Sequence, residues 1–196
     1  MPKIIGDTLA DHRDQVRIRL FEAIKHLIVV RGYDAITLAD VAAEAGVGRT
    51  AVYNHFPDKE SVLLGWAVEE TEQYLTRLKA ALDTEDDPVG QLTVFLRMQM
   101  LELATHHTRL AGIGTALSAD GRKAIRDHVA PMMQILRDIM QRAMDTGAIA
   151  QQDITASVPL ISAVTTARFT TGLEGDALEN EIEAATSFIL HGIAVV

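Results

Sequence analysis

The stretch TLADVAAEAGVGRTAVYNHFPDK, residues 37–59, decides how this chain folds. It reads as two short helices joined by a tight turn. Thr37 can cap the first helix, and Asp40 stands three residues on, at the second position of a capping box. Gly46 supplies the left-handed residue that ends a helix, because a β-carbon disfavours that conformation. The stretch therefore predicts a helix-turn-helix unit.

The second of these helices is too polar to belong to a core. A polar helix held across another fits the major groove of DNA, where its side chains meet base edges and phosphates. Phosphate contacts are expected from Thr37, Tyr53 and Lys59, and base contacts from Arg49, Thr50 and Asn54. The full predicted DNA-binding set is Thr37, Arg49, Thr50, Tyr53, Asn54, His55 and Lys59.

With its flanks, the stretch resembles the tetracycline-repressor (TetR) family over roughly residues 10–65. The resemblance is carried by Gly32, Tyr33, Thr37, Val41, Ala42, Ala45, Gly46, Val47, Val52, Tyr53, His55, Phe56 and Lys59. That family places a Ser, a basic residue and a Gly after the Gly-Val pair. Here Gly48, Arg49 and Thr50 follow, so the basic residue is kept and the capping hydroxyl is absent. The resemblance implies a dimeric transcriptional repressor that a small-molecule effector releases from a palindromic operator on double-stranded DNA.

Hydrophobic periodicity predicts an all-α chain of about nine helices. Besides the two central ones, helices are expected over residues 10–31, 59–82, 89–106, 108–117, 120–146, 153–173 and 177–194. Pro131 lies inside one of them and predicts a kink, because proline removes a backbone donor. We expect a helix-turn-helix DNA-binding domain over residues 1–58. An effector-binding and dimerisation domain, which the resemblance implies, would occupy residues 59–196.

The formal net charge of −9 is distributed unevenly. Residues 1–60 hold 8 Lys and Arg against 9 Asp and Glu, whereas residues 61–196 hold 10 against 18. The acidity therefore lies away from the predicted DNA-binding region, where local basic groups can meet phosphates. Cysteine is absent, no signal-peptide pattern opens the chain, and no run of 18 apolar residues occurs. We expect a soluble, cytoplasmic protein without a membrane partner.

No motif in the chain indicates an enzyme, a cofactor or a metal site. A glycine-rich phosphate loop and a helical His pair at i, i+4 are both missing. His106 and His107 are adjacent, and neighbours on a helix point too far apart to chelate one metal well. The alternative to a regulator is a small helical enzyme that uses His106 or His128 as its acid–base group.

Methionines and a few polar residues on otherwise apolar helices indicate a ligand pocket. Methionine adapts to varied apolar ligands, and a buried polar group requires a partner, which a ligand can supply. Ordinary core packing remains the alternative for each of these residues. The predicted pocket, for a mostly apolar small molecule, comprises Phe95, Met98, Gln99, Glu102, His106, Met132 and Leu136.

The last two predicted helices have long apolar faces. Pairing with a two-fold mate would bury such faces in a four-helix interface. The predicted homodimer interface consists of Val158, Ile161, Val164, Ile182, Ile189 and Ile193.

Overall fold

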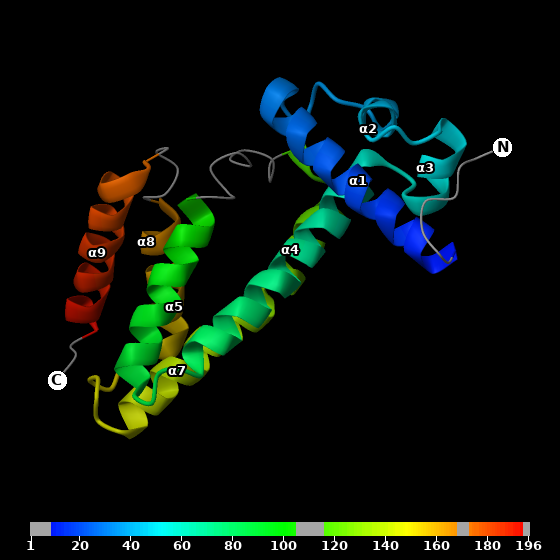
Figure 1. The fold of residues 1–196 in the computed structure, drawn as a ribbon. Coiled ribbons are helices and arrows are strands. Elements are labelled where there is room, and N and C mark those ends of the chain that lie inside the picture. Colours follow the sequence, from blue (N-terminus) through cyan, green and yellow to red (C-terminus); the bar gives the residue numbers. More distant parts are fainter. Residues whose placement is uncertain (1–8, 105–115, 168–172, 194–196) are drawn as a thin grey trace. The chain divides into compact units, whose positions relative to one another are not determined.

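The computed structural model of the 196-residue chain describes residues 9–104, 116–167 and 173–193 (Figure 1). Every secondary-structure element of these residues is an α-helix, which confirms the predicted all-α class. Eight helices are described: α1 (Leu9–Arg31), α2 (Leu38–Glu44), α3 (Arg49–His55), α4 (Lys59–Leu82), α5 (Pro88–Glu102), α7 (Ala119–Asp145), α8 (Ile154–Ala167) and α9 (Gly175–Gly192). The short helix expected over residues 108–117 falls almost entirely outside the described residues. None of the helices described is long and apolar enough to cross a membrane.

The chain divides into two compact units. One consists of residues 1–70 and 112–127, and the other of residues 71–111 and 128–196. Both α4 and α7 begin in the first unit and continue into the second. The functional limits expected from the sequence, 1–58 and 59–196, stay a prediction.

The first unit is built around α1, which buries one apolar face. Val16, Leu20 and Ile24 are at most 4% exposed, as the three-to-four-residue spacing predicts. The inward side chains of the next three helices complete this core: Leu38, Val41, Ala42, Val52, Val62, Leu63 and Trp66. At Gly65 of α4, an added β-carbon would lie 3.1 Å from the rings of Phe21 and Phe56. The absence of a side chain there lets α4 approach the aromatic pair.

The second unit has a core of its own, formed by the C-terminal half of α4 with α5, α7, α8 and α9. Asp87 caps α5 by accepting hydrogen bonds from the backbone N–H groups of Val89 and Gly90, and Pro88 occupies the first turn, where its missing N–H is tolerated. α7 runs as one helix through Pro131. The expected kink at that proline stays a prediction.

Candidate nucleic-acid interface

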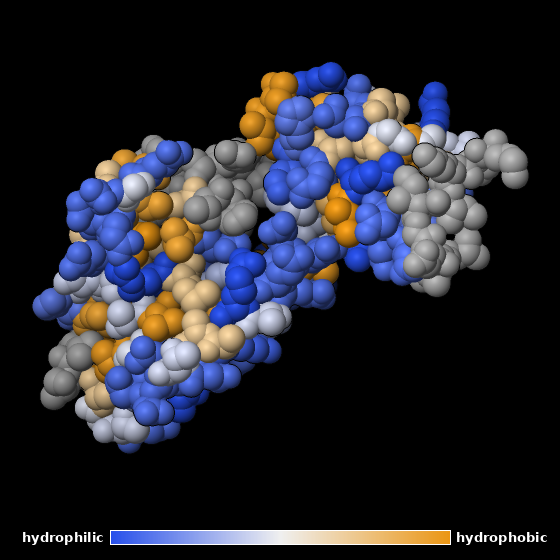
Figure 2. All heavy atoms as spheres, in the orientation of Figure 1, coloured by the Kyte–Doolittle hydropathy of each residue, from blue (hydrophilic) through white to orange (hydrophobic). Residues whose placement is uncertain are grey.

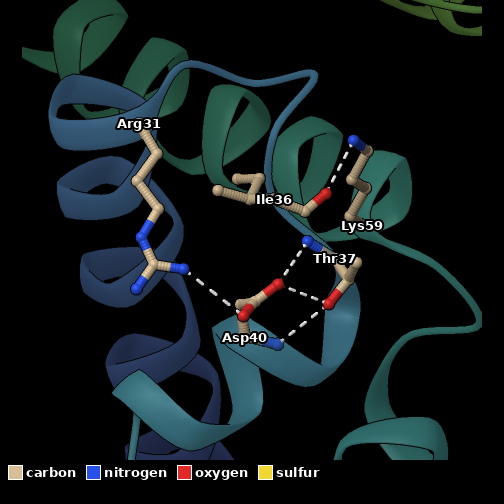
Figure 3. A network of polar contacts seen from close by, with 5 residues as sticks. All are labelled: Arg31, Ile36, Thr37, Asp40 and Lys59. Carbon is tan, nitrogen blue, oxygen red and sulfur yellow. Dashed lines mark hydrogen bonds and ion pairs between the residues drawn. The ribbon is translucent and has the colours of Figure 1, made fainter.

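The start of α2 is fixed by a complete capping box (Figure 3). The hydroxyl of Thr37 accepts from the backbone N–H of Asp40 at 3.2 Å, and the Asp40 carboxylate accepts from the backbone N–H of Thr37 at 2.8 Å. The same hydroxyl donates to Asp40, so its donor is already used inside the protein. These bonds to Thr37 lower the pKa of Asp40, with a smaller contribution from Arg31. Thr37 orders the helix start, and a phosphate would have to compete with Asp40 for its hydroxyl.

The turn between α2 and α3 is a Schellman-type stop. The N–H of Val47 donates to the carbonyl of Ala42 at 2.9 Å, and the N–H of Gly46 donates to that of Ala43 at 3.1 Å. Gly46 has a φ of 62°, in the left-handed region that favours glycine. Val47 is buried after the turn, so this short link holds α3 against α2 at a fixed angle.

α3 separates into a buried side and a polar side. Val52 is fully buried, whereas Arg49, Thr50, Tyr53 and Asn54 are exposed. At about 100° per residue these four side chains span an arc of roughly 140° on one face. They enter no hydrogen bond or ion pair with the part of the chain that the structure describes, and α3 contains no carboxylate. The predicted base-reading residues therefore form one available polar face.

His55 closes α3 in a half-buried position. Burial lowers its pKa, and the positive charges of Arg13 and His12 on α1 lower it further. The three residues thus form a basic corner between the end of α3 and the start of α1. An approaching phosphate would favour the charged form of His55, opposite to the effect of burial.

Lys59 lies in a different environment from the one that the sequence predicted (Figure 3). Figure 3 shows its Nζ donating to the backbone carbonyl of Ile36, at 2.8 Å. The same Nζ also donates to the carbonyl of Tyr33 at 2.8 Å and lies 4.3 Å from the centre of the Tyr33 ring. An ammonium group has three donors, and two are used within the protein. Lys59 therefore holds the loop before α2 in place, and its part in phosphate binding stays a prediction.

The predicted ligand-binding residues are mostly packed into the core of the second unit. Phe95, Met132 and Leu136 are buried, and Met98 packs against the same core. Gln99 accepts a hydrogen bond from the hydroxyl of Tyr74 at 3.1 Å, so that neighbour already satisfies its amide oxygen. Glu102 pairs with Arg77 at 3.0 Å. His106 lies outside the described residues. The other six predicted residues lie in one region, and their role in ligand binding stays a prediction.

A hollow does occur in this unit, at a different place. It has a volume of about 200 Å³ and lies open to solvent beside the ends of α4 and α7. Its polar lining includes Lys79, Asp83, Gln91, Asp138 and Arg142. Arg142 and Gln91 are hydrogen-bonded to each other. The mixed charge and open shape do not match the apolar pocket expected from the sequence.

The predicted dimer residues prove to face the interior. Val158, Ile161, Ile182, Ile189 and Ile193 are all less than 9% exposed within one chain, and Val164 is half-buried. These five side chains are buried within one chain, and their assignment to a dimer interface stays a prediction. Within the chain, α8 and α9 pack against α5 and against each other, and the five side chains belong to the core of the second unit.

Other apolar side chains of the same helices point outward. Leu160 on α8 is 67% exposed and Phe188 on α9 is 68% exposed. Apolar surface is visible in the region of α5 and α9 in Figure 2. Periodicity alone could not identify these residues, because both sides of α8 and α9 carry apolar positions.

Comparison with known proteins supports this description of the head, the helix-turn-helix region around residues 20–65. Residues 20–65 match the family model of bacterial regulatory proteins, tetR family. The HTH-type transcriptional regulator AlkX of Mycobacterium tuberculosis is 32% identical over 71 residues, which cover 36% of this chain and 34% of that relative. The chain spans less than two thirds of the length of the curated relatives that it matches.

Solved structures match over nearly the whole chain. The fatty acid degradation regulator FadR from Bacillus halodurans superposes with a TM-score of 0.80 at 18% identity, covering 99% of this chain and all of the other. FadR from Bacillus subtilis, solved in complex with stearoyl-CoA, gives a TM-score of 0.78 at 21% identity, covering 90% of this chain and 98% of the other. The fold is thus that of helix-turn-helix regulators with a helical C-terminal part. Within this fold, residues 20–65 are similar to the tetR family of bacterial regulatory proteins.

Proposed function

We propose that this chain is a transcriptional regulator that binds operator DNA as a homodimer and is released by a small-molecule effector. The observation that carries the proposal is the polar face of α3. Its four exposed side chains have no partner in the described part of the chain, and no carboxylate on the helix repels phosphate. The match of residues 20–65 to the tetR family supports the same function. A protein that acts on genomic DNA would work in the cytoplasm.

The DNA contacts divide between that face and its surroundings. Arg49 and Asn54 have the geometry to read bases, because a guanidinium grips guanine and an amide grips adenine. The exposed hydroxyl of Tyr53 is suited to a phosphate oxygen. Thr37 and Lys59 would support these contacts indirectly, because they fix the start of α2 and the loop before it. A two-fold dimer would present two such helices to successive major grooves of a palindromic operator.

The dimer contact would use the outward surfaces of α8 and α9. Leu160 and Phe188 are the large exposed apolar side chains of these helices, and small residues such as Ala156, Ala163 and Ala184 are exposed beside them. Small side chains allow a partner helix to approach closely, and the two large ones can fill the space that remains. The predicted dimer is therefore kept, with a different set of residues.

The effector would be mostly apolar. The core of the second unit around Phe95 and Met132 is mostly hydrocarbon, and its buried polar groups are the hydrogen-bonded pair of Tyr74 and Gln99 and the side chains of Thr165 and Thr186. A ligand entering there would separate residues that now touch and could take over that hydrogen bond. The neighbouring FadR structure that holds stearoyl-CoA shows that this fold accommodates an acyl-chain compound in one relative.

No specific observation favours the enzyme alternative. His106 lies outside the described residues, and His128 is half-buried on α7. Among the residues described, no three His, Asp or Glu side chains are grouped as a metal site would require.

The test is selection of duplex DNA by the purified chain from a random double-stranded library, followed by affinity measurement at several salt concentrations. We expect a palindromic sequence whose binding weakens as salt rises. Arg49→Ala should weaken binding to it by about 1–3 kcal/mol if the residue reads a guanine. Arg137→Ala, an exposed arginine on α7, is the matched control and should bind like the wild type. Selection of no sequence at all would refute the proposed function.

A further inference from the structure

At the start of α7, the local sequence supplies only part of a capping box. Ser118 is the N-cap residue, and its hydroxyl accepts a hydrogen bond from the backbone N–H of Gly121 at 2.9 Å. In a complete box, a Glu or Gln at that third helical position reaches back to the N–H of the N-cap residue. Gly121 has no side chain and cannot do so. The N–H of Ser118 therefore needs an acceptor from elsewhere.

Glu60 of α4 supplies that acceptor. Its Oε2 accepts from the backbone N–H of Ser118 at 3.1 Å, and its Oε1 accepts from the Ser118 hydroxyl. A β-carbon added to Gly121 would overlap Oε1 of Glu60, so the missing side chain makes room for the carboxylate. We propose that Glu60 completes the capping box of α7 from another helix, and that this shared cap couples the first turn of α7 to the first turn of α4.

The same chain contains the ordinary form of this motif. In α2, Thr37 and Asp40 exchange the two bonds within four residues. In α7, the serine and the bonded N–H are local, but the carboxylate comes from 58 residues earlier in the sequence. A local box stabilises one helix. A shared box stabilises a helix only while two helices stay together, so α7 loses its cap when its start moves away from α4.

The residue before Glu60 extends the coupling to the DNA-binding head. Lys59 donates to the carbonyls of Tyr33 and Ile36, and Ile36 immediately precedes the N-cap of α2. Two consecutive side chains of α4 therefore hold the starts of two other helices. A displacement at the start of α7 would reach the entrance of α2 through a single turn of α4. This regulatory consequence rests on the proposed function, whereas the shared cap itself does not.

The experiment compares amide hydrogen exchange in the 196-residue chain for three variants. Glu60→Ala removes the carboxylate. The double variant Glu60→Ala with Gly121→Glu returns a carboxylate to α7 itself, at unchanged net charge, and so restores a local box without the link to α4. Glu72→Ala, an exposed residue of α4, is the matched control. The peptides to follow are residues 116–125, 58–64 and 33–41.

We expect Glu60→Ala to speed exchange in all three peptides, by about fivefold in residues 116–125, the usual effect of losing a helix cap. The double variant should restore slow exchange in residues 116–125 while residues 58–64 and 33–41 stay fast. Unchanged exchange in Glu60→Ala would overturn the shared cap. Recovery of all three peptides in the double variant would overturn the coupling. If Glu60→Ala does not fold, Glu60→Ser, which is short enough to leave room for a side chain at position 121, replaces it in both variants with the same expected order of peptides.

A second measurement separates this inference from the proposed function. On the duplex that the wild type selects, both Glu60→Ala and the double variant should bind more weakly than the wild type and equally to each other. A purely local role for the cap would instead return the double variant to wild-type affinity. If the wild type selects no duplex, the proposed function fails, while the exchange experiment still decides whether the cap is shared.

Discussion

Lys59→Ala is the substitution whose effect the structure defines most fully. It removes two hydrogen bonds from an ammonium group to the carbonyls of Tyr33 and Ile36, both at 2.8 Å, and a cation–π contact at 4.3 Å. A hydrogen bond to a charged group contributes about 1.5–3 kcal/mol, and an exposed cation–π contact about 0.5–1 kcal/mol. At the lower end these three contacts together give about 3.5 kcal/mol. Because Lys59 is only half-buried and water can replace the lost bonds to the freed carbonyls, we expect a smaller loss of about 2 kcal/mol.

Urea unfolding, followed by circular dichroism and by exchange of residues 33–41, measures this loss. Lys123→Ala is the matched control, because Lys123 makes only an exposed ion pair with Asp127 in the next turn. Such a pair contributes about 0.3–0.5 kcal/mol. If Lys59→Ala loses no more stability than Lys123→Ala but lowers the salt dependence of DNA binding by about one phosphate contact, Lys59 is a DNA ligand and our reasoning about the loop is wrong.

Three further outcomes are expected. Burial raises the pKa of Tyr74, so the stability that this residue contributes is complete below about pH 10 and is lost at higher pH. Tyr74→Phe should reduce this alkaline loss of stability, as measured by thermal unfolding at a series of pH values. Phe188→Glu should convert a dimer into a folded monomer in sedimentation experiments, because Phe188 is exposed. Ile161→Glu should instead unfold the second unit, because Ile161 is buried. A Phe188→Glu variant that still sediments as a dimer would contradict the proposed interface. Met132→Trp should cost about 1–3 kcal/mol by overpacking, and unchanged stability would instead indicate a cavity beside Met132.

The sequence predicted the local structure of the head well, because the signals there are local. The capping box of Thr37 and Asp40 and the stop at Gly46 each lie within a few residues and were found as expected. The polar face of α3 followed from the same short-range spacing. What the sequence could not supply was the partner of a long side chain. The ammonium of Lys59 can reach a phosphate or a carbonyl equally well, and only the folded loop decides.

The second unit was harder to predict for a related reason. In α8 and α9, apolar residues occur on more than one side, so periodicity does not tell which side the same chain covers. The five isoleucine and valine positions that were assigned to a partner are covered by other helices of the same chain. The cap of α7 was likewise invisible, because its acidic member and its serine belong to distant segments.

The empty position at Gly121 has a consequence for how relatives of this chain can change. An acidic side chain introduced at that position would supply the cap locally and would release the acid at position 60 from its role there. Conversely, a chain that keeps glycine at position 121 depends on the distant carboxylate. The two positions should therefore vary together during evolution, with an acid retained at one or the other, and such a compensating pair would mark the contact between α4 and α7 in sequences whose structures are unknown.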